Sequence, residues 1–149
     1  LHQHELAFPS PAAFAASLLT RAHLKSINVA FDPVYVRSHD SVYRAVAEGL
    51  YAAGGGVKRT FASTDPTVRE RLKIAWTTHP FTPHALAVHP RVPSHVVSKI
   101  QHTLLKLDSK ERFPKILKPI NFKGFIGAEH SDWDDVKALG LTELTKPNR

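Results

Sequence analysis

Short apolar runs alternate with amphipathic helical stretches along the first half of the chain. Residues 5–8 are predicted to form a strand. Ser10 followed by Pro11 then marks the start of an Ala-rich helix, because Ser is a favoured N-cap and Pro a favoured first helical residue. One face of this helix is predicted to be buried and carries Phe14, Leu18 and Ala22. The first unit is therefore a strand that leads directly into a helix.

The same order of strand and helix is predicted again after residue 30. The β-branched and aromatic run 34–36 favours a strand, and a helix follows it. The apolar stripe of this helix is formed by Val42, Ala45 and Val46. The helix is expected to end at Gly49, because glycine readily adopts the left-handed conformation of a helix C-terminus.

A third strand is predicted at residues 50–53, running into three consecutive glycines at 54–56. Residues without side chains permit positive φ or a close approach of the backbone to a neighbour. Asp65 and Pro66 start a short helix, and residues 73–77 follow as another strand. This alternation predicts an α/β fold with a mostly parallel sheet flanked by helices.

Helical segments dominate the predicted C-terminal part, after a region broken by four prolines, Pro80, Pro83, Pro90 and Pro93. Residues 84–88 are predicted as a strand. A helix is predicted over 94–107, where apolar residues recur at spacings of three and four. Near the end, Ser131 is predicted to cap a helix that Gly140 terminates.

The composition is that of an ordinary folded domain with an excess of positive charge. Twenty Lys and Arg against 13 Asp and Glu give a formal charge of +7 over 149 residues, which favours an anionic partner or simply a soluble basic surface. The basic residues are scattered, which disfavours nucleic-acid binding. With no cysteine, disulfides, thiolate metal sites and cysteine nucleophiles are excluded. No apolar run approaches the roughly 18 residues of a spanning helix.

The chain begins at Leu1 and contains no Met. We therefore expect its N-terminus to arise from processing or truncation, and any signal peptide to have been removed.

The triplet Ser38-His39-Asp40 contains the residue types of a hydrolase triad, but adjacent side chains leave the backbone in different directions and cannot form that line of groups. Two interpretations of His39 remain. It either binds an anion beside the free N–H groups of a helix N-terminus, or it is a capping histidine in a loop. Residues 10–13 form a second predicted helix N-terminus that can accept a phosphate-like group, although most such turns in α/β proteins are empty.

The ten histidines raise the hypothesis of a metal site. The candidate ligands lie in the N-terminal segment and in the proline-rich region and are His2, His4, His79, His84 and His89. Zinc requires three or four converging ligands, and extended, proline-broken segments do not favour that convergence. Neither a metal nor a cofactor is expected. The glycines at 54–56 match neither a Walker loop nor a dinucleotide-binding pattern.

Taken in order, several segments resemble the phosphate, phosphite and phosphonate-binding proteins of ABC transporters, which belong to the type II periplasmic binding protein superfamily. The matching segments are LAFPSP (6–11), VRSHDSV (36–42) with AVAEG (45–49), LKIAW (72–76) leading to PFTP (80–83), and GF (124–125) with DWDDV (132–136). The resemblance implies two α/β lobes with an anion bound in the cleft between them. It also implies a location in the periplasm or otherwise outside the cytoplasm.

The resemblance assigns residues 6–78 to a ligand-binding lobe and residues 79–149 to a crossover strand and C-terminal helices that complete the other lobe. The chain lacks the family's first part, which supplies most of that other lobe. We therefore expect exposed lobe surface and self-association into a homo-oligomer.

The resemblance predicts a non-enzymatic binding protein for a small oxyanion such as phosphate, phosphite or a phosphonate. Its partner is either an ABC transporter permease or, if the chain is an extracytoplasmic sensor domain, a signalling kinase. A different alternative is an enzyme fragment with His39 or His84 as general base. The predicted ligand-binding residues are Ser10, Ala12, Ala13, Ser38, His39, Asp40, Ser41, Arg59 and His84.

Two departures from the family pattern affect the expected ligand. The family's Ser-Thr-Ser turn, whose hydroxyls contact the phosphonate, is replaced by residues 10–13, which offer one hydroxyl and the backbone. Where aminophosphonate binders carry acids for the ligand's ammonium group, this chain carries Arg59 and His84. An aminoalkylphosphonate is therefore not expected as the ligand.

Overall fold

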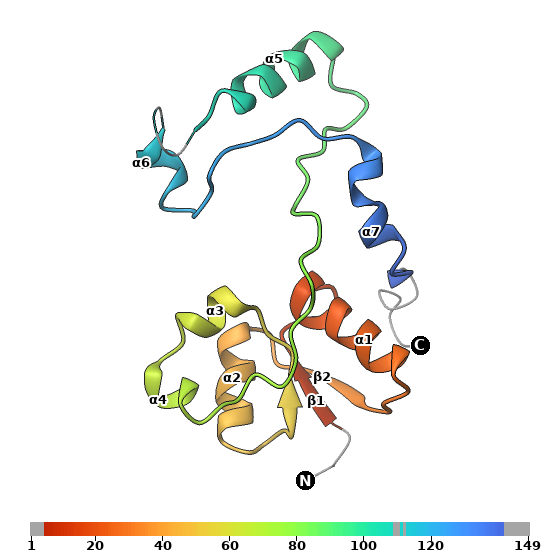
Figure 1. Ribbon diagram of the computed structural model, residues 1–149, viewed down its shortest axis with the longest axis vertical. Coiled ribbons are helices and arrows are strands. Elements are labelled where there is room, and N and C mark those ends of the chain that lie inside the picture. Colours follow the sequence, from red (N-terminus) through yellow and green to blue (C-terminus); the bar gives the residue numbers. More distant parts are fainter. Residues whose placement is uncertain (1–4, 109–110, 112, 142–149) are drawn as a thin grey trace. The chain divides into compact units, whose positions relative to one another are not determined.

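The computed structural model describes residues 5–108, 111 and 113–141 (Figure 1). The chain divides into two compact units, one formed by residues 1–80 with 136–149 and the other by residues 81–135. Among the described residues, no helix combines the length and the apolar character needed to cross a membrane.

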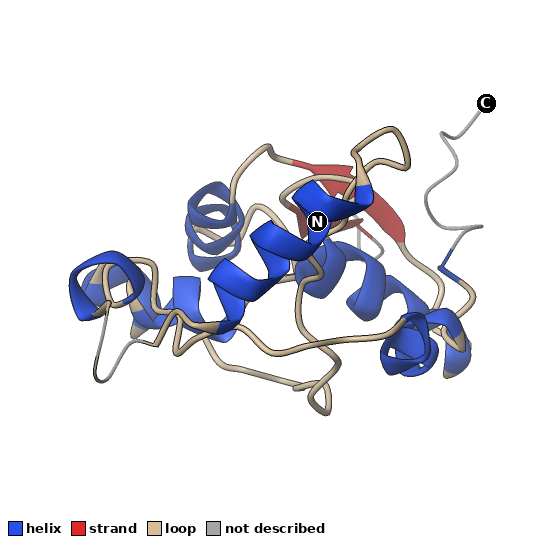
Figure 2. Ribbon diagram, turned by 90° about the horizontal axis from the view of Figure 1, so that it is seen from above, coloured by secondary structure: helices blue, strands red, loops and turns tan. Residues whose placement is uncertain are grey.

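The first unit is built on a parallel sheet of three strands in the order β2-β1-β3 (Figure 2). The strands are β1 (Glu5–Phe8), β2 (Asp32–Tyr35) and β3 (Ala53–Gly54). The central strand pairs in parallel with both neighbours, so that Leu6 lies opposite Pro33 on one side and Ala53 on the other. The predicted α/β fold with a parallel sheet is confirmed.

Helices lie on either side of these strands, with α1 and α2 flanking them in Figure 1. The helices of this unit are η1 (Phe14–Leu19, a π-helix), α1 (Thr20–Ser26), α2 (His39–Ala47), α3 (Lys58–Ala62) and α4 (Pro66–Arg69). As predicted, α2 is followed by Gly49, which has a φ of +77°. Asp65 caps α4 by accepting a hydrogen bond from the Thr67 N–H at 2.9 Å.

The core of the first unit lies between β1 and α2. Ala7, Val42 and Tyr43 are buried together, and several partly buried apolar side chains surround them: Val36, Val46, Tyr51, Phe61, Val68 and Leu72. On β1, Phe8 is fully buried and packs near the rings of Phe31 and Tyr35. Removal of this apolar surface from water is the main force that fixes α2 against the sheet.

The helix after β1 begins later than the sequence predicts. It starts at Phe14, with Ala13 as its N-cap and no side-chain cap, whereas Ser10 and Pro11 were expected to open it. A turn intervenes, in which the Ala13 N–H donates to the Ser10 carbonyl at 3.4 Å. The Ala13 carbonyl accepts hydrogen bonds from the N–H groups of both Ser17 and Leu18. The bond from Leu18 spans five residues, which is the hydrogen-bond pattern of a π-helix.

Three predicted strands are also corrected. Residues 50–53 were expected to form a buried strand, but Leu50 is 63% exposed and β3 spans only Ala53–Gly54. The Leu50 N–H instead closes the end of α2 by donating to the Ala45 carbonyl. The structure assigns no strand to residues 73–77 or 84–88. An apolar, β-branched run favours extended backbone, but it becomes a strand only where a neighbouring strand pairs with it.

The three glycines at 54–56, at the end of β3 and directly after it, let neighbouring atoms pack closely against the backbone and do not adopt positive φ. A Cβ on Gly55 would lie 1.8 Å from the Ala16 carbonyl oxygen in η1, and one on Gly54 would lie 2.5 Å from a methyl of Val42. A Cβ on Gly56 would strike the ring of Tyr43. These three positions therefore let η1 and α2 both pack directly against the backbone that follows β3.

The second unit contains α5 (Ser94–Leu105), α6 (Pro114–Leu117), the 3₁₀ helix η2 (His130–Trp133) and the first residues of α7 (Asp134–Lys137). The long helix predicted at 94–107 is confirmed as α5. Ser131 is not the N-cap that we predicted. Glu129 occupies that position, and its N–H donates to the Asp132 carboxylate at 2.7 Å.

Contacts distant in sequence hold the ends of the second unit together. The indole N–H of Trp133 donates to the Pro83 carbonyl at 2.8 Å, and Asp135 accepts from the Thr82 N–H at 3.0 Å. Leu117 is 1% exposed, whereas no residue of α5 is fully buried. The described part of this unit is therefore held more by individual hydrogen bonds than by a large apolar core.

We predict that Gly55→Ala destabilises the chain by about 3 kcal/mol or more, because the new methyl group would overlap a backbone carbonyl that cannot rotate away. Urea unfolding measures the change in the free energy of unfolding. The matched control is Gly127→Ala, where no atom lies within 4 Å of the added carbon and little change is expected. Equal effects of the two substitutions would contradict the packing role of Gly55.

Candidate functional site

Three loops begin side by side at one edge of the sheet. Because the strands are parallel, their carboxyl ends meet at the same edge, and residues 9–13, 36–41 and 55–59 follow these ends. The pairing continues past the strands, since the Val36 N–H donates to the Phe8 carbonyl and the Gly55 N–H to the Ala7 carbonyl, both at 2.9 Å. Most of the residues predicted to bind a ligand therefore come from neighbouring loops.

The strand order also marks this edge as the place for a ligand. From β1 the chain passes to β2 on one side, and it then returns across β1 to β3 on the other side. Loops that leave in opposite directions open a crevice beyond the carboxyl ends of the strands, which is where open α/β sheets bind ligands. The loops at residues 9–13 and 55–59, which follow β1 and β3, flank this position beyond the strand ends.

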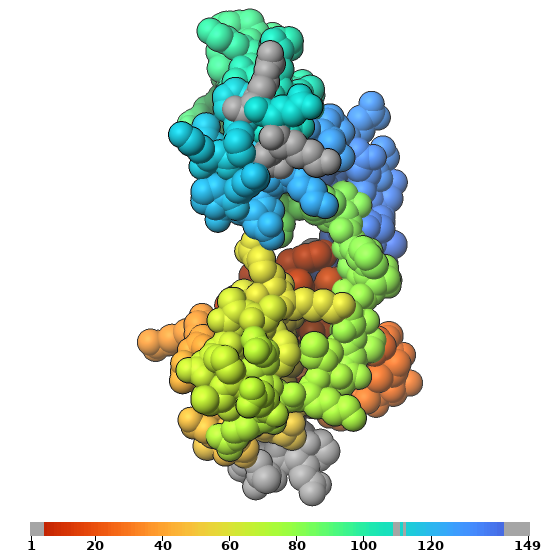
Figure 3. Space-filling model, turned by 60° about the vertical axis from the view of Figure 1, so that its left-hand side comes forward, coloured from red at the N-terminus to blue at the C-terminus, as the bar shows by residue number. Residues whose placement is uncertain are grey.

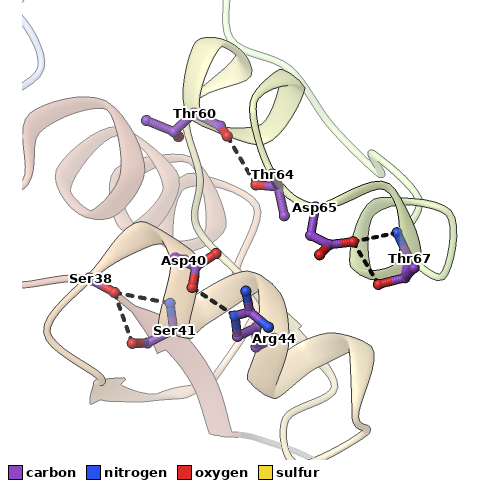
Figure 4. Close-up of polar contacts among 8 residues, drawn as sticks. All are labelled: Ser38, Asp40, Ser41, Arg44, Thr60, Thr64, Asp65 and Thr67. Carbon is purple, nitrogen blue, oxygen red and sulfur yellow. Dashed lines mark hydrogen bonds and ion pairs between the residues drawn. The ribbon is translucent and has the colours of Figure 1, made fainter.

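The second loop ends at the N-terminus of α2, which is capped by Ser38. The Ser38 Oγ accepts the Ser41 N–H at 3.0 Å and lies 2.8 Å from the Ser41 Oγ (Figure 4). The first N–H groups of a helix have no partner within the helix and carry partial positive charge. This end of α2 is therefore suited to an anion.

His39 is the first residue of α2, beside this cap. Its Nδ1 atom is buried and has no hydrogen-bond partner among the described residues. A buried polar nitrogen without a partner costs free energy, and such atoms in native proteins call for an explanation.

Asp40, the acidic residue in the first turn of α2, forms an ion pair with Arg44. The Asp40 carboxylate accepts a hydrogen bond from the Arg44 Nε at 2.7 Å, and Asp65 lies on the other side of the guanidinium (Figure 4). The hydrogen bond and the charge of Asp40 raise the pKa of Arg44, with a smaller contribution from Asp65. The pair is exposed and adds little stability, but it neutralises a negative charge that would oppose an anion at the helix end.

Tyr43 connects α2 to the third loop. Its hydroxyl accepts the Val57 N–H at 3.0 Å and lies 2.7 Å from the Thr60 Oγ1. The phenol thereby fixes the point where the chain leaves the glycines and starts α3, which carries Arg59. The sequence pattern does not single out Tyr43 as a functional residue, although its spacing from Val46 places it on the same apolar stripe.

The structure places the predicted ligand-binding residues as follows. Ser10 and Ala12 are exposed in the turn after β1, and Ala13 is half-buried at the start of η1. The helices α3 and α4 form the yellow and lime surface of Figure 3. Arg59 is exposed in α3. These residues and the first turn of α2 share one edge of the sheet. His84 lies in the second unit, in an exposed extended segment.

The candidate metal ligands do not form a site within the described part of the chain. No three His, Asp or Glu side chains come together there in a way that could hold a metal ion. His2 and His4 lie outside the described residues. His89 has a local role, because its Nδ1 accepts the Arg91 N–H at 3.1 Å.

A shallow hollow of about 560 Å³ lies at the opposite edge of the sheet, where Lys25, Asn28 and Asp32 contribute to its lining. It adjoins the C-terminal end of α1, and Arg21 also contributes to its lining. None of the predicted ligand-binding residues lines it. The carboxyl edge therefore remains the better candidate.

We predict that the Asp65 cap stabilises the fold in a pH-dependent way. Hydrogen bonds from the Thr67 hydroxyl and N–H lower the pKa of Asp65. A carboxyl group whose pKa is lower in the folded state stabilises the fold above its ordinary pKa, and this contribution is lost as the pH falls through the folded value. Asp65→Asn should therefore be less stable than the parent chain at pH 7, and the difference should shrink below about pH 4. Urea unfolding across this range measures it, and a constant difference would contradict the prediction.

We predict that Tyr43→Phe lowers the free energy of unfolding by about 1–3 kcal/mol, because the Val57 N–H loses its acceptor. Hydrogen exchange of the Val57 amide should become faster. Tyr51→Phe is the matched control, since Tyr51 packs against the same core. If the Val57 amide exchanges at the same rate in Tyr43→Phe as in the parent chain, the phenol does not fix this loop.

A family model described as the periplasmic substrate-binding protein of phosphonate ABC transporters matches residues 1–133. The match covers about nine-tenths of the chain and includes β1, α2, the glycine segment and α5. The chain therefore belongs to the family of periplasmic substrate-binding proteins of phosphonate ABC transporters.

Proposed function

We propose that this protein captures a small oxyanion, such as phosphate, phosphite or a phosphonate without an amine, and delivers it to the permease of an ABC transporter. The family is one of transport proteins that bind a small molecule outside the cytoplasm, and it is not a family of enzymes. The observation that supports the proposal most strongly is the N-terminus of α2 at the carboxyl edge of the sheet, where Ser38, His39 and Ser41 stand together.

The hydroxyls of Ser38 and Ser41 can supply a further donor. Between them they hold two protons, and their mutual hydrogen bond uses one. The other proton can be donated to an anion oxygen. Together with the N–H groups of the first turn of α2 that do not donate to Ser38, this gives several donors at one helix end.

Charge on neighbouring elements favours an anion over a zwitterion. Asp40 is neutralised by Arg44, and Arg59 on α3 adds a guanidinium that can form two parallel hydrogen bonds with an oxyanion. An ammonium group would require an unpaired carboxylate. The first turn of α2 offers only Asp40, which is already paired.

General-base catalysis by His39 is less consistent with the geometry. A catalytic histidine needs a third group that orients it, commonly a carboxylate bound to the other ring nitrogen. In the described part of the chain His39 Nδ1 has no such partner, and the adjacent carboxylate of Asp40 is held by Arg44. This arrangement suits binding better than proton transfer.

The proposal is tested by calorimetric titration with phosphate, phosphite, methylphosphonate, 2-aminoethylphosphonate and sulfate. We expect saturable binding of at least one oxyanion without an amine. Arg59→Ala should weaken it by about tenfold or more, because a hydrogen bond to a charged group is worth roughly 1.5–3 kcal/mol.

Lys73→Ala removes an exposed cation of the same unit that lies outside the three loops, and it serves as the control. It should leave the affinity within about twofold. Preferential binding of 2-aminoethylphosphonate, or equal losses in both variants, would contradict the assignment of the ligand class and of Arg59.

A further inference from the structure

Arg37 has a backbone conformation that its residue type disfavours. Its φ is +74°, in a region that glycine enters freely and that a bulky side chain rarely adopts. The other residues with positive φ, glycines apart, are Asn28 and Asn121 in the described part of the chain. Both are asparagines in turns that follow a helix, where this conformation is common. Arg37 is in neither situation, so its conformation calls for a separate explanation.

A tight turn between β2 and α2 imposes this conformation. Only residues 36–38 separate the two elements. The Ser38 N–H donates to the Val36 carbonyl at 3.0 Å, so that Arg37 is the central residue of a three-residue turn. Together with the φ of Arg37, this bond defines a γ-turn of the positive-φ kind, which is rare and strained. Glycine at this position would remove the strain.

The side chain of Arg37 adds no polar contact that would compensate for this strain. It is exposed, and within the described residues its guanidinium forms no hydrogen bond and no ion pair. Other arginines of the first unit do form such contacts, since Arg44 bonds to Asp40 and Arg69 donates to a backbone carbonyl. Residues held in disfavoured conformations cluster at ligand-binding and active sites. The strain at Arg37 therefore indicates a functional use of its side chain.

The position of Arg37 fits such a use. It lies in the loop at 36–41, one of the three loops at the carboxyl edge of the sheet, and it directly precedes the cap of α2. Arg59 follows β3, on the other side of the central strand. Two arginines thus come from the segments that follow the two outer strands. Asp40, the carboxylate in the same loop, is already paired with Arg44 and does not compete for Arg37.

We propose that Arg37 is a further ligand-binding residue of the anion site, and that its guanidinium binds the oxyanion from the side of β2. This inference rests on the proposed function and adds a residue that the sequence pattern does not single out. A guanidinium can donate two parallel hydrogen bonds to a phosphate-like group, which makes it a strong and directional ligand for an oxyanion. The strained turn is the consequence of placing an arginine where the fold alone favours glycine.

Two substitutions separate the guanidinium from the strained backbone. Arg37→Ala removes the guanidinium but keeps a Cβ and hence the strain, whereas Arg37→Gly removes both. Calorimetric titration with phosphate, phosphite, methylphosphonate and sulfate measures affinity, and urea unfolding measures stability. We expect both variants to bind the parent chain's oxyanion at least fivefold more weakly. Arg37→Gly should unfold at a higher urea concentration than Arg37→Ala, the reverse of the order at an ordinary backbone position.

Three further variants serve as controls. Arg71→Ala removes an exposed arginine of the same unit outside the three loops, and Asn28→Gly changes another residue with positive φ. Both should leave the affinity within twofold. Arg37→Lys keeps the charge but not the planar pair of donors. It should bind the oxyanion more weakly than the parent chain and more tightly than Arg37→Ala.

Each contrary result has a distinct meaning. Unchanged affinity in Arg37→Ala, or an equal loss in Arg71→Ala, would refute direct binding by the guanidinium. A loss confined to Arg37→Gly would assign the effect to a looser loop, and an Arg37→Gly chain less stable than Arg37→Ala would refute the strain. If the parent chain binds none of the four oxyanions, the proposed function fails and the role of Arg37 fails with it. Binding by the parent chain that survives Arg37→Ala would overturn the role of Arg37 alone.

Discussion

The contact between Gly55 and the Ala16 carbonyl is the constraint on which the first unit depends. Because no side chain separates them, η1 lies directly on the backbone after β3, while Gly54 and Gly56 admit Val42 and Tyr43 from α2. The helices η1 and α2 thus both pack against the short glycine segment at 54–56. The positions of the loops at the carboxyl edge follow from that packing, and so does the geometry of the candidate site.

The sequence predicts the α/β alternation because strand and helix periodicities are local properties. Elements such as α2 and α5 were predicted within a few residues for this reason. The segments 73–77 and 84–88 were wrongly predicted as strands, because pairing depends on a neighbour that local pattern does not reveal. The late start of η1 has a related cause, since the turn after β1 competes with the cap at Ser10.

At the candidate site, the sequence pointed to His39 because it lies next to a recognisable helix start, and the family resemblance added Ser38, which the structure shows to be the helix cap. The sequence did not point to Tyr43 or Arg44. The role of Tyr43 depends on a hydrogen bond to Val57, 14 residues away, and that of Arg44 on two carboxylates from different elements. Such roles arise only after folding brings distant groups together. The ligand-binding roles of all nine predicted residues stay predictions: Ser10, Ala12, Ala13, Ser38, His39, Asp40, Ser41, Arg59 and His84.

Pro33 in β2 restricts how copies of this chain can associate. It lies in an edge strand, where a residue without an N–H leaves the outer side short of a hydrogen-bond donor, and the adjacent Asp32 is exposed and charged. The opposite edge, β3, is only two residues long. Neither edge is a good template for an added strand, so the sheet is protected from growing into larger aggregates. Self-association of this unit would have to use side-chain surfaces instead of backbone pairing.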